Sequence, residues 1–416
     1  MKNAYIHRFC EPWLLELLSD VAAIMLVGPR ASGKTTLAAR HAKTVFRMDL
    51  PEVRAAMAAD PDGLLAGAEC PNLVDEWQLE PACLAAAKRL VDADDTPGRL
   101  IFAGSAAEEI GPHSWPATGR FVRVPVWGLT RLEIESGKRK RTFFDVVADD
   151  EFDGTFALPP LARRPNTVGY IERALESGFP QALQRSSERT RVAWLNSYID
   201  HLVARDAALL AEVRDPSKLR RYLKIIAAST AGIPNLTTLL DASNLNRETA
   251  ARYDRLLERL FTVEQVPAWH SNRLTRLSTH AKRYVCDTGI AAALLGANLR
   301  TIQRDGDLMG RMMDTFVAAQ IRPELTMGES PVNMYHLRQD GRKEVDLLLE
   351  RADGAVIAIE VKAATMADAH DARHLSWLRD QLSPKDFKAG IIFYTGSHVL
   401  KLDDKIWAVP MCALWA

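Results

Sequence analysis

Residues 28–35 read Gly-Pro-Arg-Ala-Ser-Gly-Lys-Thr, a complete G-x-x-x-x-G-K-[ST] phosphate-binding loop. The motif follows an apolar run at residues 21–27 and precedes a helix-like stretch at residues 35–43. This order of strand, loop and helix directs backbone N–H groups and the positive end of the helix dipole at phosphate oxygens. The alternative, a plain glycine turn between a buried strand and a helix, does not account for this context. The sequence therefore predicts that the chain binds a nucleoside triphosphate.

Within the loop, each residue type has a defined task. Lys34 is expected to reach the β- and γ-phosphates, and the Thr35 hydroxyl to take a Mg²⁺ position. Gly28 and Gly33 let the backbone curl so that successive N–H groups point inward. The residues expected to contact the nucleotide are Gly28, Pro29, Arg30, Ala31, Ser32, Gly33, Lys34, Thr35 and Thr36.

Length and composition set limits on the protein class. The 416 residues suggest two to four domains. Lys+Arg and Asp+Glu both number 53, so any site for nucleic acid must be a local patch. The five cysteines are an odd number and widely spaced, which favours reduced thiols and a cytoplasmic setting. No apolar run approaches about 18 residues, so no membrane span is expected.

Periodicity divides the chain into four stretches. Short apolar runs alternate with helix-like segments up to residue 135, which favours an α/β layer architecture. A change of composition then indicates a linker or long excursion. The expected units are residues 1–135 as a P-loop domain, 136–165 as the linker or excursion, 166–265 as a helical region, and 266–416 as a second domain with strands. Within the first unit, strands are expected at residues 45–48, 72–75, 99–104 and 121–126, and helices at 51–59 and 81–91.

Hydrolysis needs a metal carboxylate and a group that orients water. Asp75 and Glu76 follow a short apolar run, and we expect Asp75 to hold Mg²⁺ and Glu76 to polarise the attacking water. Ser105, after the strand expected at residues 99–104, is a candidate sensor of the γ-phosphate, with a turn serine as the alternative. Arg120 is a candidate arginine finger or a plain surface arginine. If Arg120 acts in trans, the protein is a homo-oligomer.

At this point the chain resembles the bacterial and archaeal AAA-type ATPases whose C-terminal half is a domain of unknown function with a nuclease-like fold. The resemblance implies that Lys34, Asp75, Glu76, Ser105 and Arg120 carry out nucleotide chemistry. The matching stretches are residues 28–36, 74–78, 104–105, 119–120 with Pro125, 176–180, 198–206, 266–269, 287–289, 344–346 and 360–362.

A second group of charged residues lies near the C-terminus. Residues 344–350 and 355–362 flank Asp353-Gly354, which is a hairpin signal. A three-residue loop at 352–354 would place Asp346 directly across from Glu360, with Cβ atoms roughly 5 Å apart. Two facing carboxylates repel each other unless a cation or Lys362 compensates them.

This pattern resembles the PD-(D/E)xK nuclease-like fold, in which an acidic residue on a preceding helix completes the site. Asp314 occupies that place, although relatives usually carry glutamate there. The resemblance implies a second Mg²⁺ or Mn²⁺ held by Asp314, Asp346 and Glu360, with Lys362 beside it. The alternatives are a salt-bridged hairpin, or a domain of this shape that binds nucleic acid or protein without cutting.

Residues 236–242 and 247–260 have the spacing of a helix–turn–helix, with Asn246 capping the second helix. Tyr253, Leu256, Leu257 and Leu260 are expected to face the core. The family resemblance supports a winged-helix-like element, with DNA contact and plain protein packing as equal alternatives.

We therefore expect an α/β protein with an AAA-type P-loop domain, a winged-helix-like helical middle and a C-terminal nuclease-like α/β domain. The expected function is Mg²⁺-dependent ATP binding and hydrolysis, coupled to nucleic-acid binding or processing, with DNA as a partner. The alternative is a nucleotide-gated regulatory protein, for example of a defence or toxin system, whose nuclease-like domain is an inactive docking surface.

Overall fold

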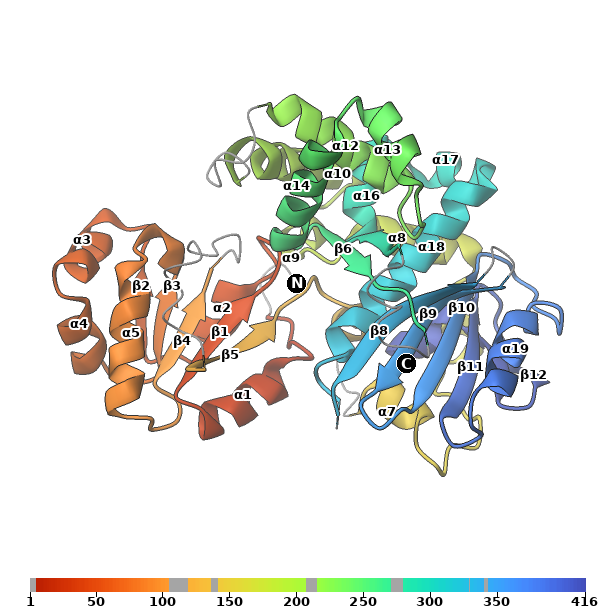
Figure 1. The fold of residues 1–416 in the computed structure, drawn as a ribbon, viewed down its shortest axis with the longest axis horizontal. Helices are drawn as coiled ribbons and strands as arrows, with labels where there is room; N and C mark the ends of the chain where they lie inside the picture. The colour runs from red at the N-terminus through yellow and green to blue at the C-terminus, as the bar shows by residue number, and fades with distance from the viewer. Residues whose placement is uncertain are drawn as a thin grey trace.

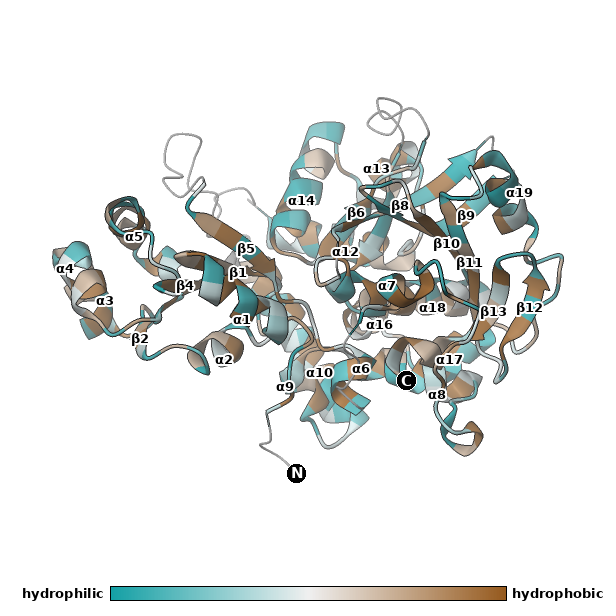
Figure 2. Ribbon diagram, turned by 90° about the horizontal axis from the view of Figure 1, so that it is seen from below, coloured by the Kyte–Doolittle hydropathy of each residue, from teal (hydrophilic) through white to brown (hydrophobic). Residues whose placement is uncertain are grey.

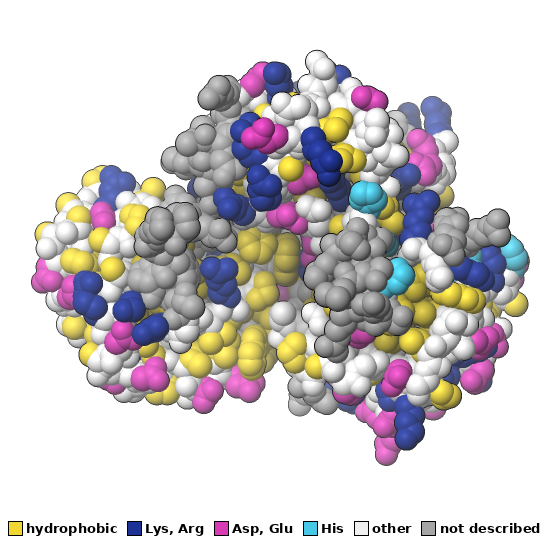
Figure 3. Space-filling view, in the orientation of Figure 1, with side chains coloured by type: hydrophobic (Ala, Val, Ile, Leu, Met, Phe, Trp, Pro, Cys, Tyr) yellow, Lys and Arg dark blue, Asp and Glu magenta, His cyan; other side chains and the backbone are white. Residues whose placement is uncertain are grey.

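The computed structural model describes residues 5–104, 119–135, 141–206, 215–270, 280–328, 330–339 and 343–416. Figure 1 shows the P-loop domain at one side of the molecule, next to a helical region that lies above a C-terminal sheet. In the same orientation, Figure 3 shows a hollowed surface between the P-loop domain and the other two regions. The expected mixed α/β architecture is confirmed.

The P-loop domain is built on a five-stranded sheet in the order β2-β3-β4-β1-β5, and all of its strand pairs are parallel. Its strands are β1 (Ala23–Val27), β2 (Thr44–Arg47), β3 (Asn72–Asp75), β4 (Leu100–Ala103) and β5 (Phe121–Pro125). Its helices are α1 (Glu11–Asp20), α2 (Lys34–Ala39), α3 (Pro51–Ala59), α4 (Pro61–Gly67), the 3-10 turn η1 (Trp77–Leu79) and α5 (Ala82–Ala93).

The central strands of this sheet are buried on both faces. Every residue of β1, β3 and β4 is buried, as expected for parallel strands covered by helices on each side. Side chains alternate along β1, so Met25 packs into the cluster that contains Leu84 of α5, whereas Ile24 packs into the cluster that contains Leu14 of α1. The strands and helices predicted here are confirmed to within a few residues, and α1 and α4 are additional.

The segment predicted as a linker or excursion packs against the distant C-terminal sheet. After α6 (Arg131–Glu135), residues 141–165 contain α7 (Phe143–Val147) and the 3-10 turn η2 (Leu161–Arg163). The rings of Phe143 and Phe393 have centroids 5.4 Å apart, and those of Phe152 and Trp407 have centroids 5.6 Å apart. The excursion therefore belongs to the C-terminal core rather than spanning solvent.

The middle of the chain is helical up to a short hairpin. Its helical elements are α8 (Thr167–Glu176), α9 (Pro180–Leu183), α10 (Glu188–His201), the π-helical turn η3 (Leu202–Asp206), α12 (Pro216–Ala228), α13 (Leu236–Ser243) and α14 (Arg247–Arg259). Strands β6 (Val263–Val266) and β7 (Lys282–Val285) then form an antiparallel pair. The inward-facing set predicted for α14 is confirmed, because Tyr253, Leu256, Leu257 and Leu260 are all buried.

The C-terminal sheet has six strands in the order β12-β13-β11-β10-β9-β8, of mixed direction. It is preceded by α16 (Thr288–Leu295), α17 (Leu299–Arg304), α18 (Gly306–Ile321) and the 3-10 turn η4 (Arg322–Glu324). The sheet and its remaining helical elements are β8 (Val332–Gln339), β9 (Lys343–Arg351), β10 (Val356–Lys362), α19 (Arg373–Gln381), β11 (Phe387–Tyr394), β12 (Leu400–Asp403), β13 (Ile406–Pro410) and η5 (Met411–Trp415).

Helices cover both faces of this sheet. Ile357 and Ile359 of β10 pack in the cluster that contains Phe316 of α18, whereas Val356 and Ala358 pack in the cluster that contains Leu375 of α19. In Figure 2, α18 and α19 lie on opposite sides of the sheet, and the strands between them are coloured largely as hydrophobic. Across the part of the chain described above, no helix has both the length and the apolar character needed to cross a membrane.

Candidate functional site

Three loops meet at one edge of the P-loop sheet. Strand β1 ends at the phosphate-binding loop, β3 ends at Asp75 with Glu76 following it, and β4 is followed by Gly104. Because the strands are parallel, their carboxyl ends lie at the same edge, where α/β sheets commonly bind ligands. A cleft of about 710 Å³ opens there. The residues of the P-loop domain that line the cleft are Arg30, Ala31, Gly33, Lys34, Thr35, Thr36, Glu76 and Gly104.

The loop backbone depends on its two glycines. Gly28 has φ +142°, and a Cβ atom there would lie 2.3 Å from the carbonyl oxygen of Val126. Gly33 has φ +99°, a backbone conformation that residues other than glycine rarely adopt. The loop therefore curls as the motif predicts, directly before α2 begins at Lys34.

Lys34 is folded back over this loop. Its side chain is 7% exposed, and Nζ donates to the carbonyl oxygens of Gly28 and Pro29 at 2.9 and 2.8 Å. Burial lowers the pKa of Lys34 to about 8, although the nearby carboxylate of Glu76 acts in the opposite direction. The ammonium group thus has neutral carbonyl partners in a site that penalises its charge, and an anion would relieve that penalty.

The predicted metal ligands lie together. The Thr35 hydroxyl donates to Asp75 Oδ1 at 2.8 Å, although the two residues are 40 positions apart in the chain. Burial raises the pKa of Asp75, while the hydrogen bond from Thr35 lowers it. A hydroxyl and a carboxylate are the hard oxygen donors that Mg²⁺ prefers, so this donor set fits that ion.

Glu76 lies next to them in a constrained backbone position. It has φ +52°, and its N–H donates to the carbonyl oxygen of Ala103 at 2.8 Å. Its carboxylate accepts a short hydrogen bond from Gln78 Nε2. These contacts hold the Glu76 side chain at the wall of the cleft. The role predicted for Glu76, polarising the attacking water, requires this position.

Two further residues were predicted to act on the nucleotide, Ser105 and Arg120. Ser105 lies outside the described residues. Arg120 precedes β5, and because β5 runs parallel to β1 with Phe121 opposite Ala23, Arg120 lies at the amino edge of the sheet. A five-residue strand separates it from the loop by roughly 16 Å, and it pairs instead with Asp92 at 2.8 Å. Arg120 thus lies away from the phosphate-binding loop of its own chain, and both alternatives given for it, an arginine finger and a surface arginine, stay predictions.

Sequence reasoning missed Arg8, which holds the loop from behind. Its side chain is buried, and it donates to the carbonyl oxygen of Ser32 at 2.7 Å, to that of Trp127 at 2.6 Å, and to Glu133 Oε1 at 3.0 Å. The attraction of Glu133 raises the pKa of Arg8 despite the opposing effect of burial. An isolated arginine before an apolar helix carries no local signal for such a role.

The far wall of the cleft was also missed, because it comes from the helical region. Its residues are Pro180, Gln181, Gln184, Trp194, Ser197, Tyr198, His201 and Leu202, from α9, α10 and η3. In Figure 2, α9 and α10 lie beside α2, which follows the phosphate-binding loop.

In the C-terminal domain the predicted hairpin is confirmed. Strands β9 and β10 are antiparallel, with Glu350 opposite Val356 and Leu347 opposite Ile359. The strands separate beyond that pair, and Asp346 Oδ2 accepts from the backbone N–H of Val361 at 2.9 Å. The predicted register is thus confirmed up to the pair of Leu347 and Ile359, whereas the predicted pairing of Asp346 with Glu360 lies beyond the residues that pair.

A lysine that sequence reasoning did not identify lies between two of the predicted metal ligands. Lys282 of β7 is 1% exposed, and its Nζ donates to Asp314 Oδ2 at 2.7 Å and to Asp346 Oδ1 at 2.9 Å. Tyr284 donates its hydroxyl to Asp314 Oδ1 at 2.9 Å. Together with the N–H of Val361, these donors engage all four oxygens of the two carboxylates.

The charges in this cluster follow from its geometry. Although burial acts to lower it, the pKa of Lys282 is raised well above its ordinary value by the two carboxylates. Burial raises the pKa of Asp314 to about 7, against the attraction of Lys282. Asp346 has a lowered pKa, because Lys282 and the N–H of Val361 outweigh its burial. One ammonium thus faces one firmly ionised carboxylate and one that titrates near neutrality.

Glu360 and Lys362 have other partners. Glu360 is 4% exposed and contacts Lys362 Nζ at 3.4 Å and His374 Nδ1 of α19 at 3.5 Å. Burial and the repulsion of Asp346 raise the pKa of Glu360 to about 7. Within the described ranges, Asp314, Asp346 and Glu360 do not form a group in which one potential ligand atom from each residue lies within 4.8 Å of the other two. That these three carboxylates hold one cation stays a prediction.

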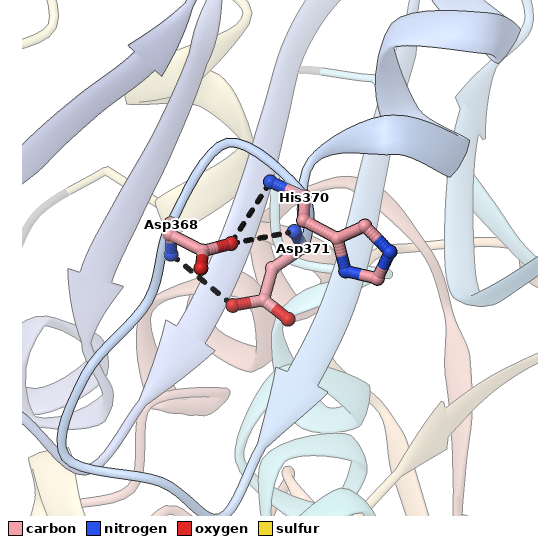
Figure 4. Close-up of side chains that lie close together, drawn as sticks. All are labelled: Asp368, His370 and Asp371. Carbon is pink, nitrogen blue, oxygen red and sulfur yellow. Dashed lines mark hydrogen bonds between the residues drawn. The ribbon is translucent and has the colours of Figure 1, made fainter.

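One cluster of possible metal ligands, Asp368, His370 and Asp371, does meet that spacing among the described residues. Figure 4 shows that Asp368 accepts hydrogen bonds from the backbone N–H groups of His370 and Asp371, and that Asp371 accepts from that of Asp368. These carboxylates stabilise an exposed turn before α19, and nothing further indicates a bound ion.

Three family models match separate parts of the chain. Residues 20–135 match a model described as AAA domain. Residues 168–301 match "Domain of unknown function (DUF8612)", and residues 309–414 match "Domain of unknown function (DUF4143)". The AAA match covers all five strands of the parallel sheet and the phosphate-binding loop.

Similar proteins include the uncharacterized protein Rv2008c of Mycobacterium tuberculosis and the uncharacterized protein Mb2031c of Mycobacterium bovis. Each is 26% identical over 402 residues, which span 95% of this chain and 82% of the relative.

Among solved structures, the Walker-type ATPase PABY2304 of Pyrococcus abyssi is 14% identical with a TM-score of 0.40, over 68% of this chain and 94% of that one. Protein VC1899 of Vibrio cholerae is 11% identical with a TM-score of 0.19, over 95% of both chains. Both scores are too low to indicate a shared overall fold. Residues 20–135 are thus similar to an AAA domain and carry a P-loop on a parallel sheet.

Proposed function

We propose that the protein is a Mg²⁺-dependent ATPase that hydrolyses ATP at the carboxyl edge of the P-loop sheet. The observation that carries this proposal is the 2.8 Å contact between the Thr35 hydroxyl and Asp75 Oδ1, beside a buried Lys34 and the cleft-lining Glu76. These four residues supply the metal ligands, the phosphate-binding ammonium and the water-orienting carboxylate that phosphoryl transfer requires.

Each side chain has one task in this scheme. Lys34 exchanges its two carbonyl partners for phosphate oxygens, which offsets the cost of its burial. Thr35 and Asp75 hold Mg²⁺, which neutralises charge on the phosphates when bound. Glu76 orients the attacking water, and Gln78 keeps its carboxylate in place. Ser105 as the γ-phosphate sensor, and Arg120 as a finger acting on a neighbouring copy, remain part of the proposal.

The test is ATP turnover by the purified full-length chain, with and without Mg²⁺. Turnover should require Mg²⁺ and be abolished in Lys34→Ala. A matched control is Lys43→Ala, because Lys43 lies shortly after α2 and forms only an exposed pair with Glu69. Turnover that persists unchanged in Lys34→Ala would contradict the proposal.

For the C-terminal domain, the placement of Lys282 supports binding rather than cleavage. A divalent ion at Asp314 and Asp346 would have to displace an ammonium that is hydrogen-bonded to both. The domain is therefore a nuclease-like unit that recognises a partner without hydrolysing it. Plasmid DNA incubated with the protein and Mn²⁺ should stay intact. Nicking that disappears in Asp346→Asn and in Lys362→Ala would restore the cleavage hypothesis.

DNA is the partner that the helical region favours. Helices α13 and α14 are joined by a short turn at residues 244–246 and followed by the β6–β7 hairpin, an order typical of winged-helix modules. Arg247 and Arg255 on α14 are exposed. Binding of duplex DNA, measured by fluorescence polarisation, should be weaker in the double variant Arg247→Ala/Arg255→Ala than in the wild type. The difference in affinity between the two proteins should become smaller at high salt. Arg300→Ala, an exposed arginine on α17, is the control; absence of DNA binding at low salt would contradict this part.

A further inference from the structure

The wall of the cleft that faces the phosphate-binding loop belongs to a different part of the chain. Pro180 begins α9, and its Cγ would lie 3.8 Å from a Cβ atom built at Gly33. The next residue, Gln181, accepts a hydrogen bond from Trp194 Nε1 at 3.2 Å. Pro180 thus lies close to the loop, and Gln181 links it to the indole ring of Trp194 on α10, which lines the same cleft.

Trp194 belongs to an ordered aromatic group. Its ring stacks on that of Tyr198, with centroids 5.5 Å apart and an interplanar angle of 23°. The ring of Phe179 lies 5.0 Å from that of Tyr198 and 6.1 Å from that of Trp194. Phe179 is 1% exposed, whereas Trp194 and Tyr198 are half-buried and line the cleft. The core thus fixes the group from below and leaves part of two rings open to a ligand.

The surroundings of these rings are polar. Gln181, Gln184, Ser197 and His201 line the same wall, so amide, hydroxyl and imidazole groups border the aromatic surface. A flat π-surface edged with hydrogen-bonding groups is suited to a nucleobase, which offers a π-face and a polar rim. The cleft volume of about 710 Å³ lies within the range of sites that enclose small ligands.

We propose that this wall binds the base of the nucleoside triphosphate, with Trp194 as the stacking residue and the amide of Gln181 or Gln184 at the edge of the base. This inference rests on the proposed function, because the loop is taken to hold the triphosphate. The ligand then bridges two regions of the chain: the loop of the P-loop domain grips the phosphates, and α10 of the helical region holds the base.

The experiment compares ATP with inorganic tripolyphosphate, which has the phosphate chain but no base. Binding of each to the full-length chain is measured by calorimetry in the presence of Mg²⁺, for wild type, Trp194→Ala and Trp194→Phe. Removing a stacking ring should weaken ATP binding by about tenfold or more, and leave tripolyphosphate binding unchanged. Trp194→Phe keeps a ring and should recover much of the ATP affinity.

Trp377→Ala is the matched control, because Trp377 is also half-buried on a helix, α19, but belongs to the C-terminal domain. It should bind both ligands as the wild type does. Unchanged ATP affinity in Trp194→Ala would overturn the base-binding role and leave the ATPase proposal intact. Equal weakening of both ligands would also overturn it, because the tryptophan would then only support the loop. If the wild type bound neither ligand, the proposed function itself would fail.

Discussion

Among the described residues, two buried lysines lie close to carboxylates, one in the P-loop domain and one on β7, and they are in opposite states. Lys34 is 7% exposed, and its Nζ donates to two neutral backbone carbonyls beside an open cleft. Lys282 is 1% exposed, and its Nζ lies between the carboxylates of Asp314 and Asp346. Among the residues that the structure describes, Lys282 pairs with two carboxylates, whereas the direct partners of the Lys34 ammonium are backbone carbonyls.

The pKa values express the same contrast. Burial lowers the pKa of Lys34 to about 8, because its carbonyl partners do not compensate the lost hydration. The pKa of Lys282 is raised well above its ordinary value, because two carboxylates more than offset a deeper burial. A site prepared for an anionic ligand carries an electrostatic penalty in the free protein, whereas a structural site has already removed that penalty.

The largest expected effect is that of substituting Glu76. This substitution tests whether the cleft at the phosphate-binding loop is catalytic. Glu76→Gln should reduce ATP hydrolysis by roughly 10²–10⁴-fold, because the neutral amide cannot polarise the attacking water. ATP affinity should be retained, and single-turnover assays with parallel binding measurements separate the two. Glu80→Gln is the control four residues along the chain. Hydrolysis within a few fold of wild type would remove Glu76 from the mechanism.

The next effect concerns stability and tests whether the second site is structural. Lys282→Met should destabilise the protein by about 3–5 kcal/mol, because it leaves two buried carboxylates without their cation. Urea unfolding of the full-length chain measures this change. Lys43→Met, which removes an exposed pair, should cost no more than about 1 kcal/mol.

A triple variant sharpens this comparison. Adding Asp314→Asn and Asp346→Asn to Lys282→Met removes the unpaired charges and should recover part of the lost stability. If Lys282→Met were as stable as wild type, the ammonium would not be a required part of the cluster.

The third prediction follows from the lowered pKa of Lys34. In the free chain this lysine is charged below pH 8 and loses its proton as the pH rises through about 8. Phosphate binding favours the charged form, so the association constant for ATP should fall by up to roughly tenfold per pH unit above that point. Calorimetric titrations between pH 7 and pH 10 measure this slope. A variant that stays charged, Lys34→Arg, should show a flat profile if it binds, and a flat profile for wild type would contradict the assignment.

The smallest expected effect concerns Arg120. Since it lies at the amino edge of the sheet and pairs with exposed Asp92, Arg120→Ala should leave turnover by diluted protein within about twofold of wild type. Turnover is measured over a range of protein concentrations. A loss that grows with concentration would indicate action in trans, and a loss of tenfold at high dilution would place Arg120 in the site of its own chain.

What the sequence could predict was local. The phosphate-binding loop, the parallel strands around it and the hairpin of β9 and β10 all follow from short patterns of periodicity and turn residues. The position of Arg120 at the amino edge of the sheet could have been predicted, because the residue before a parallel strand lies at the edge opposite the phosphate-binding loop.

What the sequence could not predict was which distant residues fill a site. Lys282 is 32 residues from Asp314 and 64 from Asp346, and its strand reads as an ordinary edge strand. Trp194 lies more than 150 residues after the loop whose cleft it lines. No short sequence pattern predicts either contact, because each depends on how separate regions of the chain pack together. The domain boundaries, the nuclease-like fold and the partner stay predictions.

The most direct test of the account is Mn²⁺ binding by the full-length protein, measured by electron paramagnetic resonance with and without a non-hydrolysable ATP analogue. We predict tight Mn²⁺ binding only when the analogue is present, abolished by Lys34→Ala and unchanged by Asp346→Asn. Tight binding without the analogue that disappears in Asp346→Asn would contradict the account, because the ion would then displace Lys282 from the C-terminal carboxylates.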